Sequence, residues 1–182
     1  IGEKFIRDFI GSQVVVAPSV SCVSMVRKYY DTLFYNSALH NEYRLLKKNI
    51  FEISDFLVNN LNIRDLGATF NHRVTFHDSC TALREYGLKD EPRILLRNVR
   101  GLELTEMERT DVCCGFGGFF SVRNEAIANS MAADKINYAL ETKAEYIVST
   151  DASCLMFLQG YIDQHKIPIK TIHLVDVLAS GY

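Results

Sequence analysis

The chain lacks the features that mark membrane, secreted and nucleic-acid-binding proteins. No apolar run among its 182 residues approaches the roughly 20 that a membrane-spanning helix needs. No basic segment followed by an apolar stretch opens the sequence, so we expect no secretory signal. With 20 Lys and Arg against 22 Asp and Glu, a net charge of −2 offers no basic surface for nucleic acid or acidic membranes. We therefore expect a cytoplasmic protein that binds no nucleic acid and has no membrane span.

Prolines and glycines are also scarce. Only three prolines and ten scattered glycines occur, so no low-complexity linker divides the chain. Hydrophobic residues make up 48% of it, and a chain of this length can bury a core of its own.

Apolar runs rich in β-branched residues alternate with helical patterns. The runs predict strands at Val14–Val16, Val74–Phe76, Leu102–Leu104, Tyr146–Val148 and Thr171–Leu174. Apolar residues at helical spacing predict helices across Val23–Phe34, Leu46–Leu57 and Ala128–Leu140. Ser121 is the predicted N-cap of the last of these. The alternation predicts an α/β fold with mainly parallel strands and flanking helices.

Two stretches resemble each other and predict a duplication. Val14–Cys22 aligns with Tyr146–Cys154, and, in the same order, Glu52–Leu57 resembles His173–Leu178. On this interpretation residues 1–64 are the C-terminal half of a first unit, and residues 65–182 are a complete second unit. The first unit is then truncated at its N-terminal side.

The chemistry-bearing residues of the sequence are five cysteines: Cys22, Cys80, Cys113, Cys114 and Cys154. In a cytosolic chain, cysteines favour metal binding, catalysis or simple burial over disulfide formation.

Cys22, Cys80 and Cys154 share one local setting. Each follows a predicted strand by a few residues, opens a helical pattern and is preceded by a serine. The serines, which can cap the helices, are Ser21, Ser79 and Ser153. A cysteine in the first turn of a helix is held as thiolate by free N–H groups and the helix dipole. Thiolate is the form that binds a metal.

Cys113 and Cys114 are adjacent and are followed by a glycine-rich loop. Vicinal cysteines are poor disulfide partners for each other but can direct two thiolates into one pocket. Gly115, Gly117 and Gly118 can adopt positive φ and bring backbone N–H groups close to sulfur. The alternative is a tight turn with two buried thiols. The loop lacks the third glycine of a dinucleotide fingerprint, which excludes nucleotide binding.

Four cysteines in the second unit are enough for one metal centre. Cys80, Cys113, Cys114 and Cys154 could hold a [4Fe–4S] cluster or a tetrahedral zinc ion. Cys22, by the repeat, belongs to a second site whose other ligands lie upstream.

Three further polar residues lie close to the cysteines in sequence. His77 is either a cofactor-binding residue, as ligand or as donor to sulfur, or a histidine satisfied by a backbone carbonyl. For Asp78 and Asp151 a helix-capping role is favoured, and Asp151 could otherwise act as an oxygen ligand.

Three segments together resemble a known family. They are His77-Asp-Ser-Cys80, Cys113-Cys-Gly-Phe-Gly-Gly-Phe-Phe-Ser-Val122 and Ser153-Cys-Leu-Met156. Their order is similar to the cysteine-rich CCG domain found in heterodisulfide reductase and in the iron–sulfur subunit of glycolate oxidase. Over residues 1–180 the chain resembles the bacterial lactate utilisation protein A family, which carries two CCG units. The long form of the family motif ends in Cys-x-x-Cys, and in this chain Asp151 replaces the first of these two cysteines. The loss of one cysteine favours a site with four thiolates.

The resemblance implies an iron–sulfur electron-transfer subunit of an L-lactate (2-hydroxy acid) oxidising complex that forms pyruvate. The partners would be other subunits of a lactate utilisation complex. No acid–base set is evident, so no catalytic residue is assigned. The alternatives are a zinc-binding structural or interaction module of that complex and a thiol–disulfide redox protein.

Overall fold

The second half of the chain is built around a parallel four-stranded sheet. The structure, a computed structural model, describes residues 1–181. The strands are β3 (Arg73–Phe76), β4 (Glu103–Leu104), β5 (Tyr146–Ser149) and β6 (Lys170–His173), in the order β4-β3-β5-β6. All three neighbouring pairs are parallel. The inner strands β3 and β5 are buried after their first residue, as expected where helices cover both faces of a parallel sheet.

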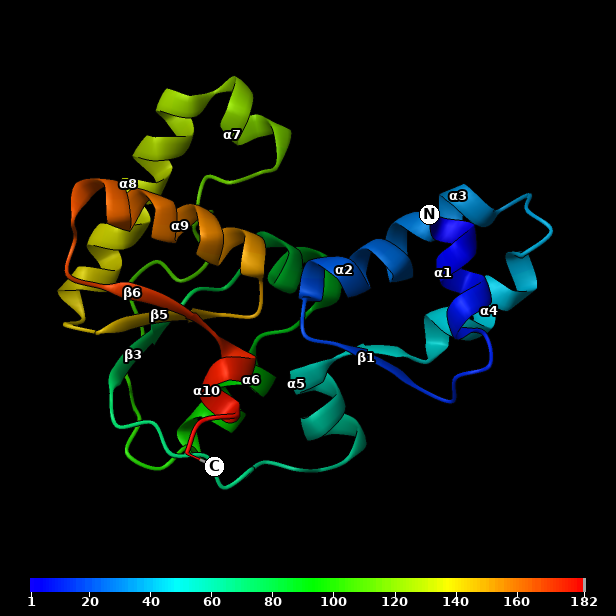
Figure 1. The fold of residues 1–182 in the computed structure, drawn as a ribbon, viewed down its shortest axis with the longest axis horizontal. Helices are drawn as coiled ribbons and strands as arrows, with labels where there is room; N and C mark the ends of the chain where they lie inside the picture. The colour runs from blue at the N-terminus through cyan, green and yellow to red at the C-terminus, as the bar shows by residue number, and fades with distance from the viewer. Residues whose placement is uncertain (182) are drawn as a thin grey trace.

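Helices form a layer on each face of this sheet (Figure 1). On one face, α8 (Glu125–Glu141) and α9 (Ala152–His165) enclose a core that includes Ile147 of β5. On the other, α6 (Asp90–Arg97) and α10 (Leu174–Leu178) enclose a core that includes the next residue, Val148. The predicted α/β class with parallel strands and flanking helices is confirmed.

The sheet reverses its winding between β3 and β5. The helix after β3, α6, packs on one face, whereas the helix after β5, α9, packs on the other. In parallel α/β sheets the crevice at the carboxyl ends of the strands at such a point is the usual ligand site. Two short segments complete this half: a π-helical turn η3 (Ala82–Tyr86) after β3, and α7 (Phe119–Arg123) before α8.

The first part of the chain carries a smaller parallel pair of strands, β1 (Val15–Ala17) and β2 (Ile50–Glu52). Its helical segments are α1 (Gly2–Phe9), α2 (Val20–Ser24), η1 (Met25–Tyr29), α3 (Tyr30–Phe34), α4 (His40–Lys48), α5 (Ile53–Asp55) and η2 (Phe56–Asn60). A separate core joins α1, the α2–α3 segment and α4, with Tyr43 at full burial.

Five strands lie where the sequence predicts them, within about two residues, but β2 was not predicted. The predicted continuous helix across Leu46–Leu57 is wrong. Helix α4 ends at Lys48, Ile50–Glu52 pair with β1, and the chain turns helical again at Ile53. The apolar spacing of this stretch fits a helix face as well as a short buried strand, an ambiguity that periodicity alone does not resolve.

The predicted N-cap of α8 is also wrong. Asn124 is the N-cap, and Ser121 lies inside α7, where its hydroxyl donates to the Gly118 carbonyl at 2.9 Å. An extra helical turn therefore separates the glycine loop from α8.

Each copy of the predicted repeat contains a pair of parallel strands, and the two pairs have the same register. Val15, Val16 and Ala17 face Ile50, Phe51 and Glu52 across the β1–β2 pair. Under the sequence alignment the equivalent pairs are Ile147–Thr171, Val148–Ile172 and Ser149–His173, and these are the pairs found between β5 and β6. The last residue of β2 and of β6 also caps the following helix with its side chain, Glu52 for α5 and His173 for α10.

Among residues 1–181, no helix combines the length and apolar character required to cross a bilayer.

Candidate metal centre

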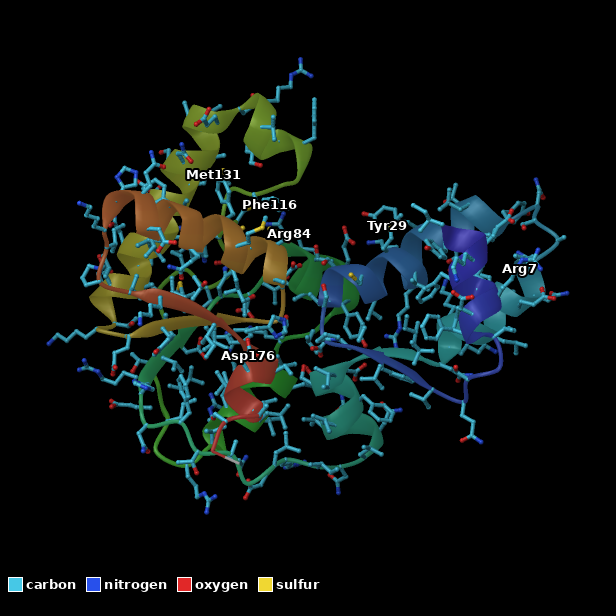
Figure 2. All side chains as sticks on the ribbon, in the orientation of Figure 1. Arg7, Tyr29, Arg84, Phe116, Met131 and Asp176 are labelled. Carbon is cyan, nitrogen blue, oxygen red and sulfur yellow. The ribbon has the colours of Figure 1, made fainter. Side chains whose placement is uncertain are left out.

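Four cysteines, Cys80, Cys113, Cys114 and Cys154, meet at the carboxyl ends of β3 and β5. Cys80 begins the helical segment after β3, and Cys154 lies in the first turn of α9, after β5. The loop between β4 and α7 brings Cys113 and Cys114 to the same place. Cys113 interacts through hydrogen bonds with Cys80 and Cys114, and Cys114 with Cys154. Figure 2 shows sulfur atoms beside the labelled side chains of Phe116 and Arg84.

His77 completes this group from the end of β3. Its ring nitrogen and the sulfurs of Cys114 and Cys154 all lie within 4.8 Å of one another. The side chain is fully buried, and among the described residues neither ring nitrogen has a hydrogen-bond partner. The carbonyl partner expected for a structural histidine is therefore not what holds this ring. Burial, reinforced by the charge of Lys135, lowers the pKa of His77 to about 3, so its imidazole is neutral and able to bind a metal.

The thiols divide into one acceptor and its donors. Hydrogen bonds from Cys114 and Cys80, together with the Gly115 N–H, lower the pKa of Cys113. Hydrogen bonding to Cys113 raises the pKa of Cys80 and of Cys114. Without a metal, the array therefore stabilises a thiolate on Cys113.

The glycine loop fits closely behind the cysteine pair. The Gly115 N–H donates to Cys113 Sγ at 3.4 Å, which is the contact between backbone and sulfur that the sequence predicts. Gly115 has φ of +95°, and a Cβ on it would lie 2.4 Å from the Ala128 carbonyl oxygen of α8. Gly117 and Gly118 also have positive φ, at +49° and +58°. The predicted positive φ of all three glycines is confirmed.

The placement of three cysteines in first helical turns is confirmed, but only one of the predicted serine caps is. The Ser79 hydroxyl accepts from the Ala82 N–H at 3.1 Å. Ser21 is wrong as a cap, because Ser19 precedes α2 and makes no side-chain capping bond. Ser153 is wrong as well, because Asp151 takes that role in α9.

Asp151 is a buried helix cap, as favoured from the sequence. One carboxylate oxygen accepts from the Ser153 N–H at 3.2 Å and from the Ser153 hydroxyl at 2.7 Å. The same oxygen accepts from the Ser21 hydroxyl of α2 at 3.4 Å. This carboxylate therefore links the start of the helix that carries Cys154 to the start of the helix that carries Cys22.

Asp78 does not cap a helix, contrary to the sequence expectation. Its carboxylate forms a buried, two-pronged ion pair with Arg93 of α6, with N–O distances of 2.9 and 2.8 Å. Arg93 also donates to Glu106 at 2.6 Å. Because Asp78 lies two residues before Cys80, this pair fixes the turn that presents that cysteine. Arg93 sits in an amphipathic pattern, and nothing in the sequence marks it as buried.

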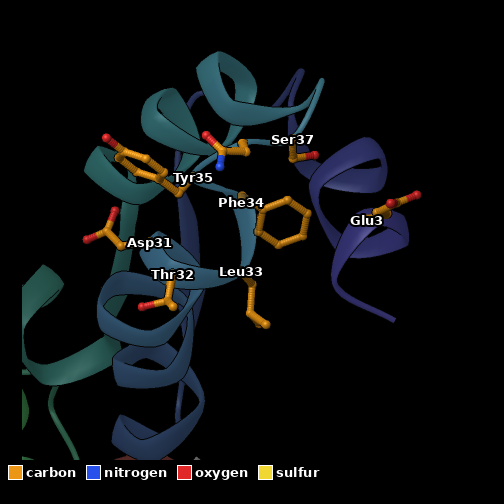
Figure 3. A pocket seen from close by; sticks show the side chains of 8 residues that line it. Glu3, Asp31, Thr32, Leu33, Phe34, Tyr35 and Ser37 are labelled. Atoms are coloured by element: carbon orange, nitrogen blue, oxygen red, sulfur yellow. The ribbon is translucent and has the colours of Figure 1, made fainter.

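Cys22 lies apart from the other four. It is exposed and lines an apolar groove of about 520 Å³ between α1, β1 and α2, with Phe9, Val16 and Met25 among its walls. A second hollow, of about 660 Å³, lies in a different place from the Cys22 groove (Figure 3). It lies against α1 and α3 between Glu3 and Asp31, and its lining holds no cysteine or histidine.

The chain is similar to known proteins over most of its length. The Cysteine-rich domain family, CCG, matches residues 74–159, which contain His77 and the four converging cysteines. The chain is 38% identical over 176 residues to Lactate utilization protein A of Oceanobacillus iheyensis, covering 97% of this chain and 72% of that protein. It is 38% identical over 178 residues to the protein of that name from Bacillus licheniformis, covering 98% and 75%. It is also 35% identical over 166 residues to the uncharacterized protein YkgE of Escherichia coli, covering 91% and 70%.

Proposed function

Because the chain belongs to the lactate utilization protein A family, we propose that it serves lactate utilisation as an iron–sulfur electron-transfer subunit. The complex would oxidise L-lactate, a 2-hydroxy acid, to pyruvate in the cytoplasm. Cys80, Cys113, Cys114 and Cys154 would be the ligands of a [4Fe–4S] cluster, the number that such a cluster requires. When bound, the cluster would accept and pass on single electrons.

The observation that carries this proposal is the donor set at the switch point of the sheet. Four thiols and a buried imidazole meet there, and the imidazole has no hydrogen-bond partner among the described residues. A buried polar group without a partner costs free energy. A metal centre would supply that partner, so these residues fit the group.

The neighbouring backbone would tune the centre. The Gly115 N–H already points at Cys113 Sγ, and hydrogen bonds to cluster sulfurs change reduction potentials. His77 would bind the metal or donate to a sulfur, and the positive φ of Gly117 and Gly118 would let the loop turn back around the centre. These four residues are the proposed cofactor-binding set.

Lactate oxidation removes two electrons and two protons, and we assign no catalytic residue for that step to this chain. Substrate chemistry would belong to other subunits of the complex, which are its proposed partners. The side chains of Phe119 and Val122 on α7, a few residues after the cysteine pair, are exposed and would be available to such a partner.

We propose two units, at residues 1–64 and 65–182, although Tyr182 lies outside the described residues. The shared register of the β1–β2 and β5–β6 pairs supports a duplication. β5 pairs on both edges, whereas β1 pairs only with β2 among the described residues, as expected of half a unit. Cys22, the third residue of α2 as Cys154 is the third residue of α9, would be a ligand of a second centre.

The donor set also supports a second candidate function, a zinc-binding structural or interaction module. One histidine and two cysteines within 4.8 Å, with further thiols beside them, are the ligand types of structural zinc sites. The third candidate, thiol–disulfide exchange, is favoured by the lowered pKa of Cys113 and by five free cysteines.

Three serine variants test the proposed ligand set. We expect Cys113→Ser and Cys114→Ser to abolish the cluster's charge-transfer absorption in anaerobically purified protein. Cys22→Ser, which changes a cysteine outside the converging group, is the matched control and should keep the absorption of the centre in residues 65–182. Unchanged absorption in both test variants would contradict the assignment.

A further inference from the structure

Lys135 is a fully buried lysine that none of the proposed ligand roles uses. It lies on α8 in a buried stripe formed with Ala132, Ile136 and Ala139. Ala132, Ile136 and Ala139 pack in the same core cluster as Cys114, so this face of the helix looks towards the cysteine centre. A lysine at full burial is rare and needs compensating charge or hydrogen bonds.

The hydrogen bonds of Lys135 reach the segment that precedes the cysteine pair. Its ammonium donates to the carbonyl of Arg109 at 2.5 Å and to that of Thr110 at 3.0 Å. Among the described residues no carboxylate lies within ion-pair distance of it. Two carbonyl dipoles therefore hold the amine in place without neutralising its charge.

The two carboxylates that face Lys135 do not neutralise its charge. Burial lowers the pKa of Lys135 to about 8, and the charges of Asp111, Asp78, Cys114 and Cys80 act in the opposite direction. Asp78 is neutralised by Arg93 at 2.8 Å. The Asp111 side chain is 63% exposed, so water screens it. The remaining facing groups are Cys114 and Cys80, which would carry negative charge as metal-bound thiolates.

We propose that Lys135 is the positioning and charge-balancing residue of the cysteine centre. Its ammonium offsets the negative charge of the thiolates and of a bound cluster, and its two hydrogen bonds fix the approach to Cys113. The charge effect rests on the proposed function. The two hydrogen bonds to residues 109 and 110 do not.

Helix α8 then supports the cysteine pair from both sides. Lys135 holds residues 109 and 110 before it, and the backbone of Ala128 packs against Gly115 after it. Reduction adds negative charge to a cluster, and a nearby buried cation stabilises that charge. Lys135 therefore raises the reduction potential of the centre relative to a neutral side chain at the same position.

Three substitutions test whether the charge of the side chain at position 135 matters, and whether it must be at that position. Lys135→Gln keeps a donor but removes the charge, Lys135→Arg keeps the charge, and Lys143→Gln makes the same charge change at an exposed site just beyond the same helix. On anaerobic protein we expect Lys135→Gln to keep its iron and sulfide while its midpoint potential becomes more negative. Lys135→Arg and Lys143→Gln should stay near the unsubstituted protein. Equal potentials for Lys135→Gln and the unsubstituted protein would overturn the proposal, as would an equal shift in Lys143→Gln.

A second readout needs no cluster. In metal-free protein, the backbone amides of residues 109–114 should exchange hydrogen several-fold faster in Lys135→Met than in Lys135→Arg, because methionine donates no hydrogen bond to the Arg109 and Thr110 carbonyls. An apolar side chain of similar length is often tolerated in place of a buried charge, so we expect Lys135→Met to fold. Equal exchange rates in the two variants would contradict the positioning role. Zinc in place of iron would refute the proposed electron transfer yet leave this comparison intact.

Discussion

At the scale of single residues, the cysteine pair depends on a residue without a side chain. Gly115 combines φ of +95° with a space in which a Cβ would meet the Ala128 carbonyl at 2.4 Å. Alanine would strain the backbone and force α8 away from the loop. The sequence motif predicted the positive φ, but it did not show which surface presses against the glycine.

We expect Gly115→Ala to lower the free energy of unfolding by about 2 kcal/mol or more and to reduce metal retention. The matched control is Gly87→Ala, which also has positive φ, of +85°, but has no atom within 4 Å of an added Cβ and lies outside the proposed binding set. It should cost about 1 kcal/mol from backbone strain alone. Thermal unfolding and metal content of the two variants provide the comparison, and equal losses would show that the contact with α8 contributes nothing.

Glu52 is the buried carboxyl group of the first part of the chain. One of its oxygens accepts from the backbone N–H groups of Ser54 and Asp55, at 2.7 and 3.2 Å, while the other has no partner among the described residues. Burial raises the pKa of Glu52 to about 7, against the opposing hydrogen bonds from Ser54 and Asp55. The folded protein therefore binds a proton that the unfolded chain releases near its ordinary pKa of 4.5.

Stability should for this reason fall as pH rises through the interval between about 4.5 and about 7, because the folded state must then give up its proton or keep a buried charge. We expect Glu52→Gln to remove a destabilisation of about 3 kcal/mol at neutral pH and above. Denaturant titrations of both proteins at several pH values measure it. A constant difference in stability between them across that interval would contradict the raised pKa.

At the scale of elements, the ion pair of Asp78 with Arg93 joins α6 to the turn after β3. Both side chains are buried, so removing the cation would leave an uncompensated carboxylate beside Cys80. We expect Arg93→Ala to destabilise the fold by about 3–5 kcal/mol. Arg97→Ala removes the same side chain from an exposed position of the same helix and should have little effect. Similar unfolding midpoints for the two variants would contradict a structural role for the pair.

The sequence predicted the elements whose pattern is local. The five predicted strands and the first-turn placement of Cys22, Cys80 and Cys154 depend on apolar runs and on the residues that follow them. β2 was missed because its three residues fit a helix face equally well, and their pairing with β1 depends on residues some 35 positions away in the chain.

The parts of the site that were missed are long-range. Lys135 lies 22 residues after Cys113, in a segment whose sequence predicts an amphipathic helix. Arg93 lies 15 residues after Asp78. Neither carries a local motif, and their roles follow only from which surfaces the sheet brings together. The error over the N-cap of α9 has a local cause. Ser153 and Asp151 are both good N-cap residues and lie two positions apart, so the sequence alone does not decide between them.

At the scale of the whole molecule, the topology accounts for the position of the centre. Helices on opposite faces follow β3 and β5, and the carboxyl ends of these strands meet at the resulting crevice. Cys80 and Cys154 follow those two strands directly, and the longest excursion from the sheet, between β4 and β5, supplies Cys113 and Cys114. A cysteine centre built in this way draws its ligands from segments that only the complete sheet assembles.

The central claim is that this centre binds an iron–sulfur cluster, and its most direct measurement is the iron, sulfide and zinc content of anaerobically purified protein, with EPR spectra after dithionite reduction. The account predicts about four irons and four sulfides for the centre of residues 65–182, with an EPR signal that appears on reduction. Stoichiometric zinc without iron would contradict electron transfer by this chain.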